Sequence, residues 1–296
     1  MKLIKNARVF KAVLPSASAL EKHLAEKPFT EPMLLEAGSI GFIERDGFGL
    51  VTPFHGGLAF AVRIDEKIVP VGAINTELNK RVKEIEQREG RKVGKKFRAE
   101  LKDGVIADLR CKALVRTAII TCFYDTKNNY LIVPTTSATI AGRIVSLLVH
   151  AVGSVKTETI HVSDVKQGLT TRMKAWLDGD EDAFDDFDPQ GQVSLAVNGQ
   201  SLTIKMASLA NAREGLQKAF ETGFEVKSIR LFDGEVASFV MSSDFVFSSI
   251  AFPAAPYDDN VEDLWQHEAA AQVLSFSSII TKLCAMFAYK EEQVAA

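Results

Sequence analysis

The sequence of 296 residues lacks the patterns on which several classes of protein depend. Its three cysteines, Cys111, Cys122 and Cys284, have no CxxC spacing, so we expect reduced thiols in a cytosolic protein. The longest apolar windows, such as residues 140–152, contain charged or polar residues and fall short of the roughly 20 residues that span a bilayer. Residues 1–15 have no continuous apolar segment before a small-residue cleavage site. We therefore expect neither a membrane partner nor a secretory signal.

Motifs of several enzyme chemistries are absent as well. The five histidines are scattered, and none pairs with cysteine or an acid at metal-ligand spacing. Gly47 and Gly49 lack the third glycine of a dinucleotide fingerprint, and Gly94 lacks the companions of a phosphate-binding loop. No GxSxG nucleophile elbow is present. We predict that the protein is not an enzyme, with no catalytic residue, no metal and no cofactor.

Acidic residues are dense in one place, residues 178–188, which hold seven acids and no base. The first acids of this run imitate the first ligands of a calcium loop. However, Ala183 occupies the sixth position, where that loop needs glycine, and Pro189 occupies the twelfth, where it needs a bidentate glutamate. We interpret residues 178–190 as a solvated acidic loop that would keep DNA away from its face. A DNA-processing enzyme, which needs a carboxylate–metal site, would have to build that site here.

Positive charge is concentrated elsewhere in the chain. The formal net charge is −3, yet residues 77–116 hold thirteen Lys or Arg and seven Asp or Glu. Within them, residues 88–102 carry seven bases against two acids. Binding to a polyanion depends on the local potential rather than on the overall isoelectric point. An acidic chain with such a segment is therefore compatible with a nucleic-acid partner.

The basic segment is predicted to form two amphipathic helices, the first capped by Asn75. Gly90 and Gly94 interrupt the pattern between them. Apolar residues at steps of three and four form the stripes of the two helices: Ile74, Leu78, Val82 and Ile85, then Phe97, Leu101, Val105 and Leu109. We expect each helix to turn its stripe inward and its basic face to water.

The rest of the chain alternates strand and helix patterns. Residues 1–72 predict short strands and one early helix, and residues 117–125 and 130–135 predict a hairpin followed by a helix. Asn198-Gly199 predicts a second hairpin with a type I′ turn. Further predicted elements are a strand at 157–162, helices at 163–177 and 211–222, strands at 225–232, 235–242 and 245–252, a strand at 270–276 and a helix at 277–289.

The pattern as a whole predicts a mixed α/β (α+β) fold with largely antiparallel sheets and amphipathic helices. No tandem repeat and no long linker is present, so we treat residues 1–296 as one unit. Its predicted parts are a basic helical arm at 73–116, a hairpin-helix region at 117–177, the acidic loop at 178–190, and C-terminal antiparallel strands with a closing helix at 191–296.

The basic arm has three possible interpretations, of which a solvated helical surface is the simplest. Five bases without an intervening acid, Arg91, Lys92, Lys95, Lys96 and Arg98, suit phosphate contacts, for which a charge on a long stem suffices. No base-reading cluster and no aromatic platform accompanies them. We predict sequence-independent binding to double-stranded DNA. The alternative is a protein-interaction adaptor whose basic arm binds an acidic protein partner.

The predicted DNA-binding residues of the arm are its exposed bases from the first helix to the first strand of the hairpin. They are Arg88, Arg91, Lys92, Lys95, Lys96, Arg98, Lys102, Arg110, Lys112 and Arg116.

The order of these elements resembles the recombination-associated protein RdgC family over nearly the full length. The N-terminal stretches that carry the resemblance are IKNARVFK, LEKHLAEKPFTEP, EKIVPVGAINTELNKRVKEIEQREGRKV and ELKDGVIADLRCKA. The later stretches are YDTKNNYLIVPTTSATIAGRIVSLLVHAVGSV, WLDGD and SIRLFDGEVASFVMSSDFVFSSIAF. The resemblance rests on their joint order, since no single motif is diagnostic.

The resemblance implies a non-enzymatic protein that binds duplex DNA without marked sequence preference and is nucleoid-associated in the cytoplasm. It also implies a ring-shaped homodimer that encircles DNA and restrains RecA-promoted strand exchange. Two departures concern the ring. Leu114 and Thr117 stand where the family aligns aromatics in a region thought to close it. After the second hairpin only Lys205 carries over from a basic–polar pair linked to DNA contact, because Met206 and Ala207 follow it.

Overall fold

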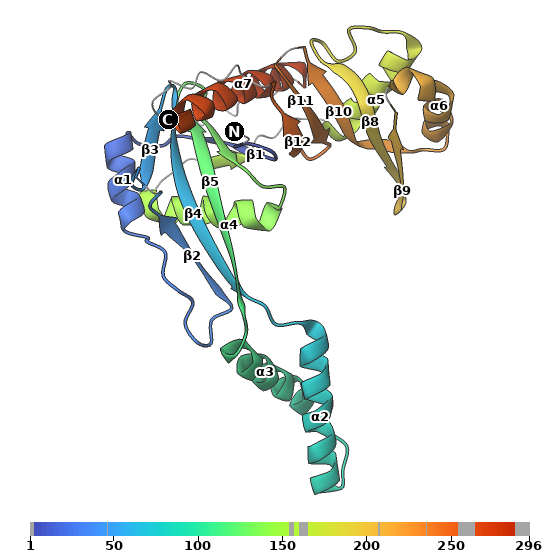
Figure 1. Ribbon diagram of the computed structural model, residues 1–296. Coiled ribbons are helices and arrows are strands. Elements are labelled where there is room, and N and C mark those ends of the chain that lie inside the picture. Colours follow the sequence, from blue (N-terminus) through green and yellow to red (C-terminus); the bar gives the residue numbers. More distant parts are fainter. Residues whose placement is uncertain are drawn as a thin grey trace.

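The protein forms two antiparallel sheets and a projecting helical arm, arranged as an arc (Figure 1). This computed structural model describes residues 3–45, 47–153, 157–159, 165–206, 208–234, 236–253 and 264–287. The arm lies at one end of the arc and the second sheet at the other. The predicted mixed α+β class is confirmed.

The first sheet forms the middle of the arc. Its strands follow the order β2-β4-β5-β6-β1-β7, with β3 also paired to β4. Their bounds are β1 Arg8–Ala12, β2 Gly38–Ile43, β3 Val51–Phe54, β4 Gly57–Lys67, β5 Val115–Asp125, β6 Tyr130–Val133 and β7 Thr157–Thr159. Two helices, α1 (Ala17–Ala25) and α4 (Ala138–Val152), cover one face, where buried leucines and isoleucines meet the strands. The predicted hairpin β5–β6 is confirmed.

The second sheet has the order β12-β11-β10-β8-β9. Its strands are β8 Asp188–Val197, β9 Gln200–Lys205, β10 Glu225–Asp233, β11 Ala237–Ser242 and β12 Phe247–Ala251. It is accompanied by α5 (Val165–Asp178), the 3-10 turn η1 (Leu209–Ala212) and α6 (Arg213–Glu221). Asn198 and Gly199 adopt φ values of 45° and 81°, as the predicted type I′ turn between β8 and β9 requires.

One long helix, α7 (Leu264–Met286), joins the two sheets, which corrects the prediction of a strand at 270–276 followed by a helix. Trp265 at its start stacks on Phe123 of the first sheet at 6.0 Å between centroids, and Phe276 meets Phe247 of the second sheet at 5.0 Å. Buried side chains recur along α7 at helical spacing, but the residues of its exposed stripe are apolar or uncharged: Ala271, Leu274, Ser278, Thr281 and Ala285. Its sequence therefore lacks the contrast between an apolar and a charged face that identifies an amphipathic helix. Within the described residues α7 is the one helix long and apolar enough to cross a membrane. Since 61% of its most apolar window is buried inside the fold, we assign it as a core helix.

The acidic segment is anchored rather than wholly solvated. Its acidic side chains are exposed as expected, but Ala183, Phe184 and Phe187 are buried in the core. Lys282 of α7 lies 3.4 Å from Asp186, and Arg172 of α5 donates a 2.7 Å hydrogen bond to the carbonyl of Ala183. The two buried phenylalanines therefore fix the path of this loop, which its acidic composition did not indicate. No group of three or more His, Cys, Asp or Glu among the described residues could hold a metal ion.

The arm consists of α2 (Val71–Glu89) and α3 (Lys95–Cys111), carried on the far ends of β4 and β5 (Figure 1). It has a small core of its own, built from Ile74, Leu78 and Val82 of α2 and Val105 of α3. The predicted helix pair is thus confirmed.

Two details of the arm prediction are wrong. Asn75 is not the N-cap, because α2 begins one turn earlier, after Pro70, whose carbonyl accepts the N–H of Ile74 at 3.1 Å. Phe97 is 44% exposed instead of buried. Each arm helix is covered by only one neighbouring helix, so the inward stripe of α3 is fully buried at Val105 alone.

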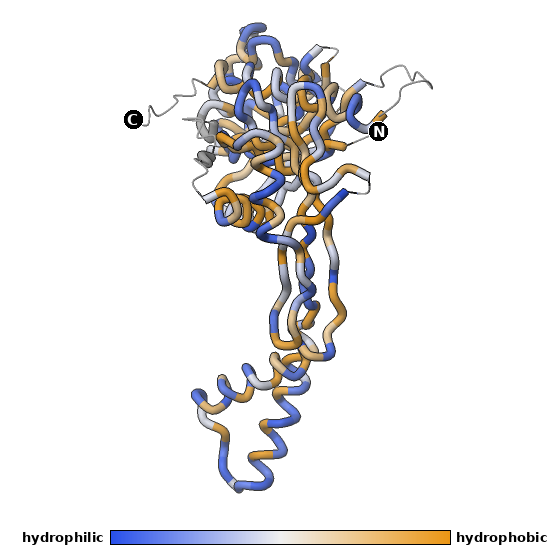
Figure 2. Tube along the Cα trace, turned by 90° about the vertical axis from the view of Figure 1, so that its left-hand side faces the viewer, coloured by the Kyte–Doolittle hydropathy of each residue, from blue (hydrophilic) through white to orange (hydrophobic). Residues whose placement is uncertain are grey.

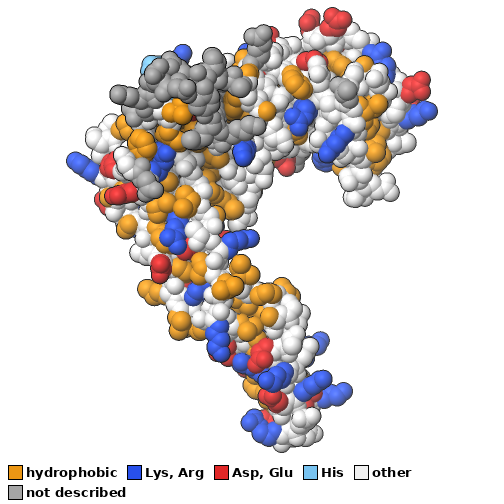
Figure 3. Space-filling model, viewed as in Figure 1, with side chains coloured by type: hydrophobic (Ala, Val, Ile, Leu, Met, Phe, Trp, Pro, Cys, Tyr) orange, Lys and Arg blue, Asp and Glu red, His pale blue; other side chains and the backbone are white. Residues whose placement is uncertain are grey.

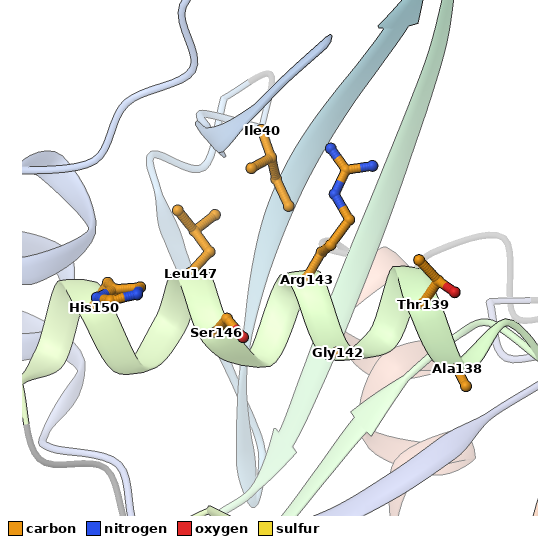
Figure 4. A pocket seen from close by; sticks show the side chains of 8 residues that line it. All are labelled: Ile40, Ala138, Thr139, Gly142, Arg143, Ser146, Leu147 and His150. Carbon is orange, nitrogen blue, oxygen red and sulfur yellow. The ribbon is translucent and has the colours of Figure 1, made fainter. Parts of the chain in front are cut away.

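An ion-pair cluster lies where the β4–β5 ribbon leaves the sheet. Glu66 of β4 accepts from Arg116 of β5 at 2.6 Å and from Arg143 of α4 at 2.7 Å. Figure 4 shows Arg143 beside Ile40 and Leu147 at a groove of about 490 Å³ along α4. The two guanidinium groups, Arg116 first, hold the pKa of Glu66 below its ordinary value of 4.5. The cluster therefore ties the root of the arm to α4.

The depressed pKa of Glu66 predicts a pH-dependent stability of the arm root. The ion pairs contribute fully above the unfolded-state value of 4.5 and lose their contribution as the pH falls through the lower folded-state value. We expect Glu66→Gln to destabilise the protein by up to about 1 kcal/mol near neutral pH, since all three side chains are partly exposed. Urea unfolding of both proteins from about pH 7 to about pH 3 measures the difference. A difference in the free energy of unfolding between the two proteins that does not change with pH would contradict the assignment of these ion pairs to Glu66.

Candidate nucleic-acid interface

The turn between α2 and α3 presents the most basic part of the chain at the far end of the arm. Gly90 ends α2 in the left-handed conformation, with φ 67° and its N–H bonded to the carbonyl of Glu86 at 2.9 Å. The N–H of Val93 also bonds to the Glu86 carboxylate, at 3.0 Å. These bonds fix the path of residues 90–94, so α3 begins at Lys95 with its bases next to the turn.

Three lysines at this end carry charge that nothing in the described part of the chain cancels. Lys92, Lys95 and Lys96 are exposed and have no ion pair among the described residues. The neighbouring Arg91 lies 3.1 Å from Glu89, and Arg98 donates to Asn79 Oδ1 at 2.7 Å. Figure 2 shows the arm helices as largely hydrophilic, and Figure 3 shows Lys and Arg side chains spread around the arm's end. The five predicted bases thus form one exposed basic surface, which we call the arm-end cluster.

The other predicted DNA-binding residues are placed differently. Arg88 shares Glu89 at 3.7 Å, while Lys102 and Lys112 are exposed without an ion pair in the described residues. Arg110 donates to the carbonyl of Leu35 at 3.1 Å, and Arg116 is paired with Glu66. These two arginines are therefore already engaged by the arm root, and their contact with DNA remains a prediction.

Lys205 lies apart from all of these residues. It is the last residue of β9 and is exposed, at the end of the arc opposite the arm (Figure 1). The fold does not bring Lys205 to the arm-end cluster of the same chain.

Arg81 is an arm cation with a structural contact that the sequence pattern did not reveal. It pairs with Glu77 at 2.9 Å and with Asp108 of α3 at 2.8 Å, and these carboxylates raise its pKa. The ion pair with Glu77 follows from helical i,i+4 spacing in the sequence, whereas the ion pair with Asp108 of the other helix becomes visible only in the folded structure. Arg81 thus joins the two helices, and the charge of the arm is less available here than at the arm's end.

The geometry suits an extended polyanion. Ammonium and guanidinium groups on long stems can neutralise phosphates and release condensed counterions with no need for a fixed partner geometry. Lys and Arg side chains also occur along the inner edge of the arc (Figure 3). An acidic protein surface could meet the same cations, which is the adaptor alternative.

Comparison with known proteins places the chain in a family. Residues 3–289 match a family model described as "Putative exonuclease, RdgC". The "Recombination-associated protein RdgC" of Neisseria meningitidis serogroup C is 26% identical over 289 residues, which cover 94% of each chain. The proteins of the same name from Neisseria gonorrhoeae strain NCCP11945 and Bordetella pertussis are 26% and 24% identical, over 94% and 83% of each chain. The family match spans almost the whole sequence, and the chain belongs to the RdgC family.

Proposed function

We propose that the protein binds double-stranded DNA through its backbone, without sequence preference, and so restrains recombination by a RecA-type recombinase. The observation that carries this proposal is the arm-end cluster, in which Lys92, Lys95 and Lys96 are exposed without an ion pair in the described residues. Counterion release makes such a surface bind any duplex, with an affinity that falls as salt rises. The name of the relatives, recombination-associated protein, supports a role at DNA in the cytoplasm, in association with the nucleoid.

We further propose that two copies form a ring around the duplex. One chain is an arc with Lys and Arg along its inner edge, and a two-fold axis would turn two such arcs into a closed hole (Figure 3). Leu114, which is 80% exposed, and Thr117 lie at the root of the arm, where the resemblance to the family aligns aromatic residues. An aromatic pair stabilises a contact by about 0.5–1.5 kcal/mol beyond the contribution of its buried area. A ring closed by aliphatic side chains should therefore open more easily.

The proposed role is not enzymatic, although the family description contains the word exonuclease. The names of the relatives refer to recombination and to no reaction. Incubation of end-labelled duplex with the protein and Mg²⁺ or Mn²⁺ tests this point. A metal-dependent activity that shortens the DNA and copurifies with the protein would contradict the proposal.

The arm-end cluster is expected to supply most of the affinity for duplex DNA. If about five phosphates are neutralised, log K should fall against log salt with a slope of about −4 to −5. The variant Lys92→Gln, Lys95→Gln, Lys96→Gln, Arg98→Gln removes exposed charge without touching the buried stripe of either helix. We expect at least about tenfold weaker binding, a shallower slope and nearly unchanged thermal stability, measured by fluorescence anisotropy at several salt concentrations.

A matched control removes three lysines and one arginine elsewhere. Lys22, Lys27, Arg213 and Lys218 are exposed on or beside α1 and α6, and their change to Gln should leave affinity and slope close to wild type. Equal losses in both variants would show that net charge alone matters. Wild-type affinity in the folded arm variant, or tight binding of an acidic protein but not of duplex, would favour the adaptor alternative.

A further inference from the structure

The arm is attached to the rest of the protein at its root (Figure 1). Its small core is a cluster separate from the cores of the two sheets. The strand β2 pairs with β4 no farther than Glu66, and beyond it two chain connections lead to the arm helices. These connections are bonded to each other, because the N–H of Ile68 donates to the carbonyl of Leu114 at 2.9 Å. The direction of the arm therefore depends on what braces this junction.

A strap of residues 27–37 runs along one face of the β4–β5 ribbon. The guanidinium of Arg63 lies 4.3 Å from the ring centroid of Phe29 in the strap, and Lys67 also bonds to the strap. Successive residues of a strand alternate between its faces, so Arg63 and Lys67 share a face and Glu66 points to the other. The ion pairs of Glu66 thus brace the ribbon on the side of α4, and the strap braces it on the opposite side.

The Met33–Leu35 turn is the part of the strap nearest the arm, and its backbone is fixed from two sides. Lys67 donates to the carbonyls of Met33 and Leu34 at 2.5 and 2.6 Å. The carboxylate of Glu36 accepts the N–H of Met33 at 2.7 Å, and the N–H of Glu36 donates to the carbonyl of Met33 at 3.1 Å. Hydrogen bonds to charged groups are stronger than neutral ones. These bonds hold the carbonyl of Leu35 in a defined position.

Arg110, in the last turn of α3, bonds the arm to this turn. Its guanidinium donates to the carbonyl of Leu35 at 3.1 Å. In the part of the chain that the structure describes, this is the one side-chain hydrogen bond from α2 or α3 to the rest of the protein. Lys67 at the end of β4 and Arg110 at the end of α3 therefore hold the same turn, one from the ribbon and the other from the arm.

The length of the arm makes its direction important for binding. The helix α2 has 19 residues, so at a rise of 1.5 Å per residue it is about 28 Å long. A rotation of about 10° at the root would move the far end of such a helix by about 5 Å. Successive phosphates of one DNA strand are about 3.4 Å apart along the helix axis. A small change of direction at the root would thus move the arm-end cluster by more than one phosphate.

We propose that Lys67 and Arg110 act through the Met33–Leu35 turn as a latch, which sets the direction of the arm and so places the arm-end cluster on the duplex. The proposal rests on the duplex binding in the proposed function. It makes Arg110 a positioning residue, although the sequence predicts it as a DNA contact. A latch bonded to backbone carbonyls releases no counterions from DNA, so its loss should lower the affinity for duplex and leave the salt dependence unchanged.

Duplex binding at several salt concentrations separates positioning from contact. Arg110→Met keeps the stem and removes the donors, and Lys67→Met does the same on the ribbon. Both should weaken binding about three- to tenfold, as expected if the arm points correctly in about a third to a tenth of the molecules. The slope of log K against log salt should not change, and Arg110→Lys should restore the affinity.

Two comparison variants calibrate this measurement. Lys95→Met removes a proposed phosphate contact and should make the slope shallower by about 0.9, whereas the exposed Lys22→Met on α1 should change neither slope nor affinity. A slope that is shallower by about 0.9 in Arg110→Met would make Arg110 a phosphate contact and overturn the proposal. Unchanged affinity in both Arg110→Met and Lys67→Met would overturn it as well.

A distance measurement tests the latch without DNA. Spin labels on Ala25→Cys of α1 and Gln87→Cys of α2 are both exposed, in a Cys111→Ser background where the other two cysteines are buried. Electron–electron double resonance in an excess of unlabelled protein reports the distance within one copy. The distribution should be narrow with the native latch, broad in Arg110→Met and Lys67→Met, and narrow again in Arg110→Lys.

The distance distributions also separate failure of the latch from failure of the proposed function. A distribution that stays narrow in both methionine variants would overturn the latch. Absence of duplex binding by the wild-type protein, with the distances changing as expected, would instead overturn the proposed function and leave the latch as a brace of the arm.

Discussion

The constraint on which the rest of the structure depends is the pairing of β4 with β5. It runs over eleven consecutive residue pairs, from Gly57–Asp125 to Lys67–Val115, and forms the β4–β5 ribbon. This ribbon carries the arm away from the sheet, so α2 and α3 pack on one another around a small core and keep their bases in water. The same ribbon places Glu66 opposite Arg116 and within reach of Arg143, which ties its root to α4. The proposed DNA contact at the end of the arm therefore depends on this ribbon.

The other end of the arc depends on α7. This helix contributes to a single large core that contains residues of both sheets, and the side chain of Gln272 accepts the N–H groups of Leu3 and Ile4 at 3.0 and 3.2 Å. Ala7 and Phe247 form a further bridge between the N-terminal segment and β12. The two sheets are therefore packed as one body, which sets where Lys205 lies relative to the arm.

Features that depend on neighbours in sequence could be predicted. The stripe of Leu78 and Val82, the Asn198-Gly199 turn and the arm-end cluster all arise within a few residues, and each of them was predicted. Contacts between distant residues could not be predicted in this way. The pairing of Glu66 with Arg143 and the bonds from Lys67 to the Met33–Leu35 turn span long stretches of chain, so neither contact was predicted. The helix α7 was missed because its exposed stripe carries apolar and uncharged residues, so the sequence lacks the polar face that identifies an amphipathic helix.

The central claim is that two arcs close around duplex DNA. Its most direct test measures how much protein stays on closed circular duplex, and on the same DNA after linearisation, following a salt challenge. A Cys111→Ser, Leu114→Cys variant, oxidised after loading, links the two copies at the root of the arm, where the proposed ring closes. We predict that the locked protein remains on circular DNA and slides off linear DNA, while the reduced protein is lost from both. Equal retention of the locked protein on circular and linear DNA would show that the duplex is held against one face, without encirclement.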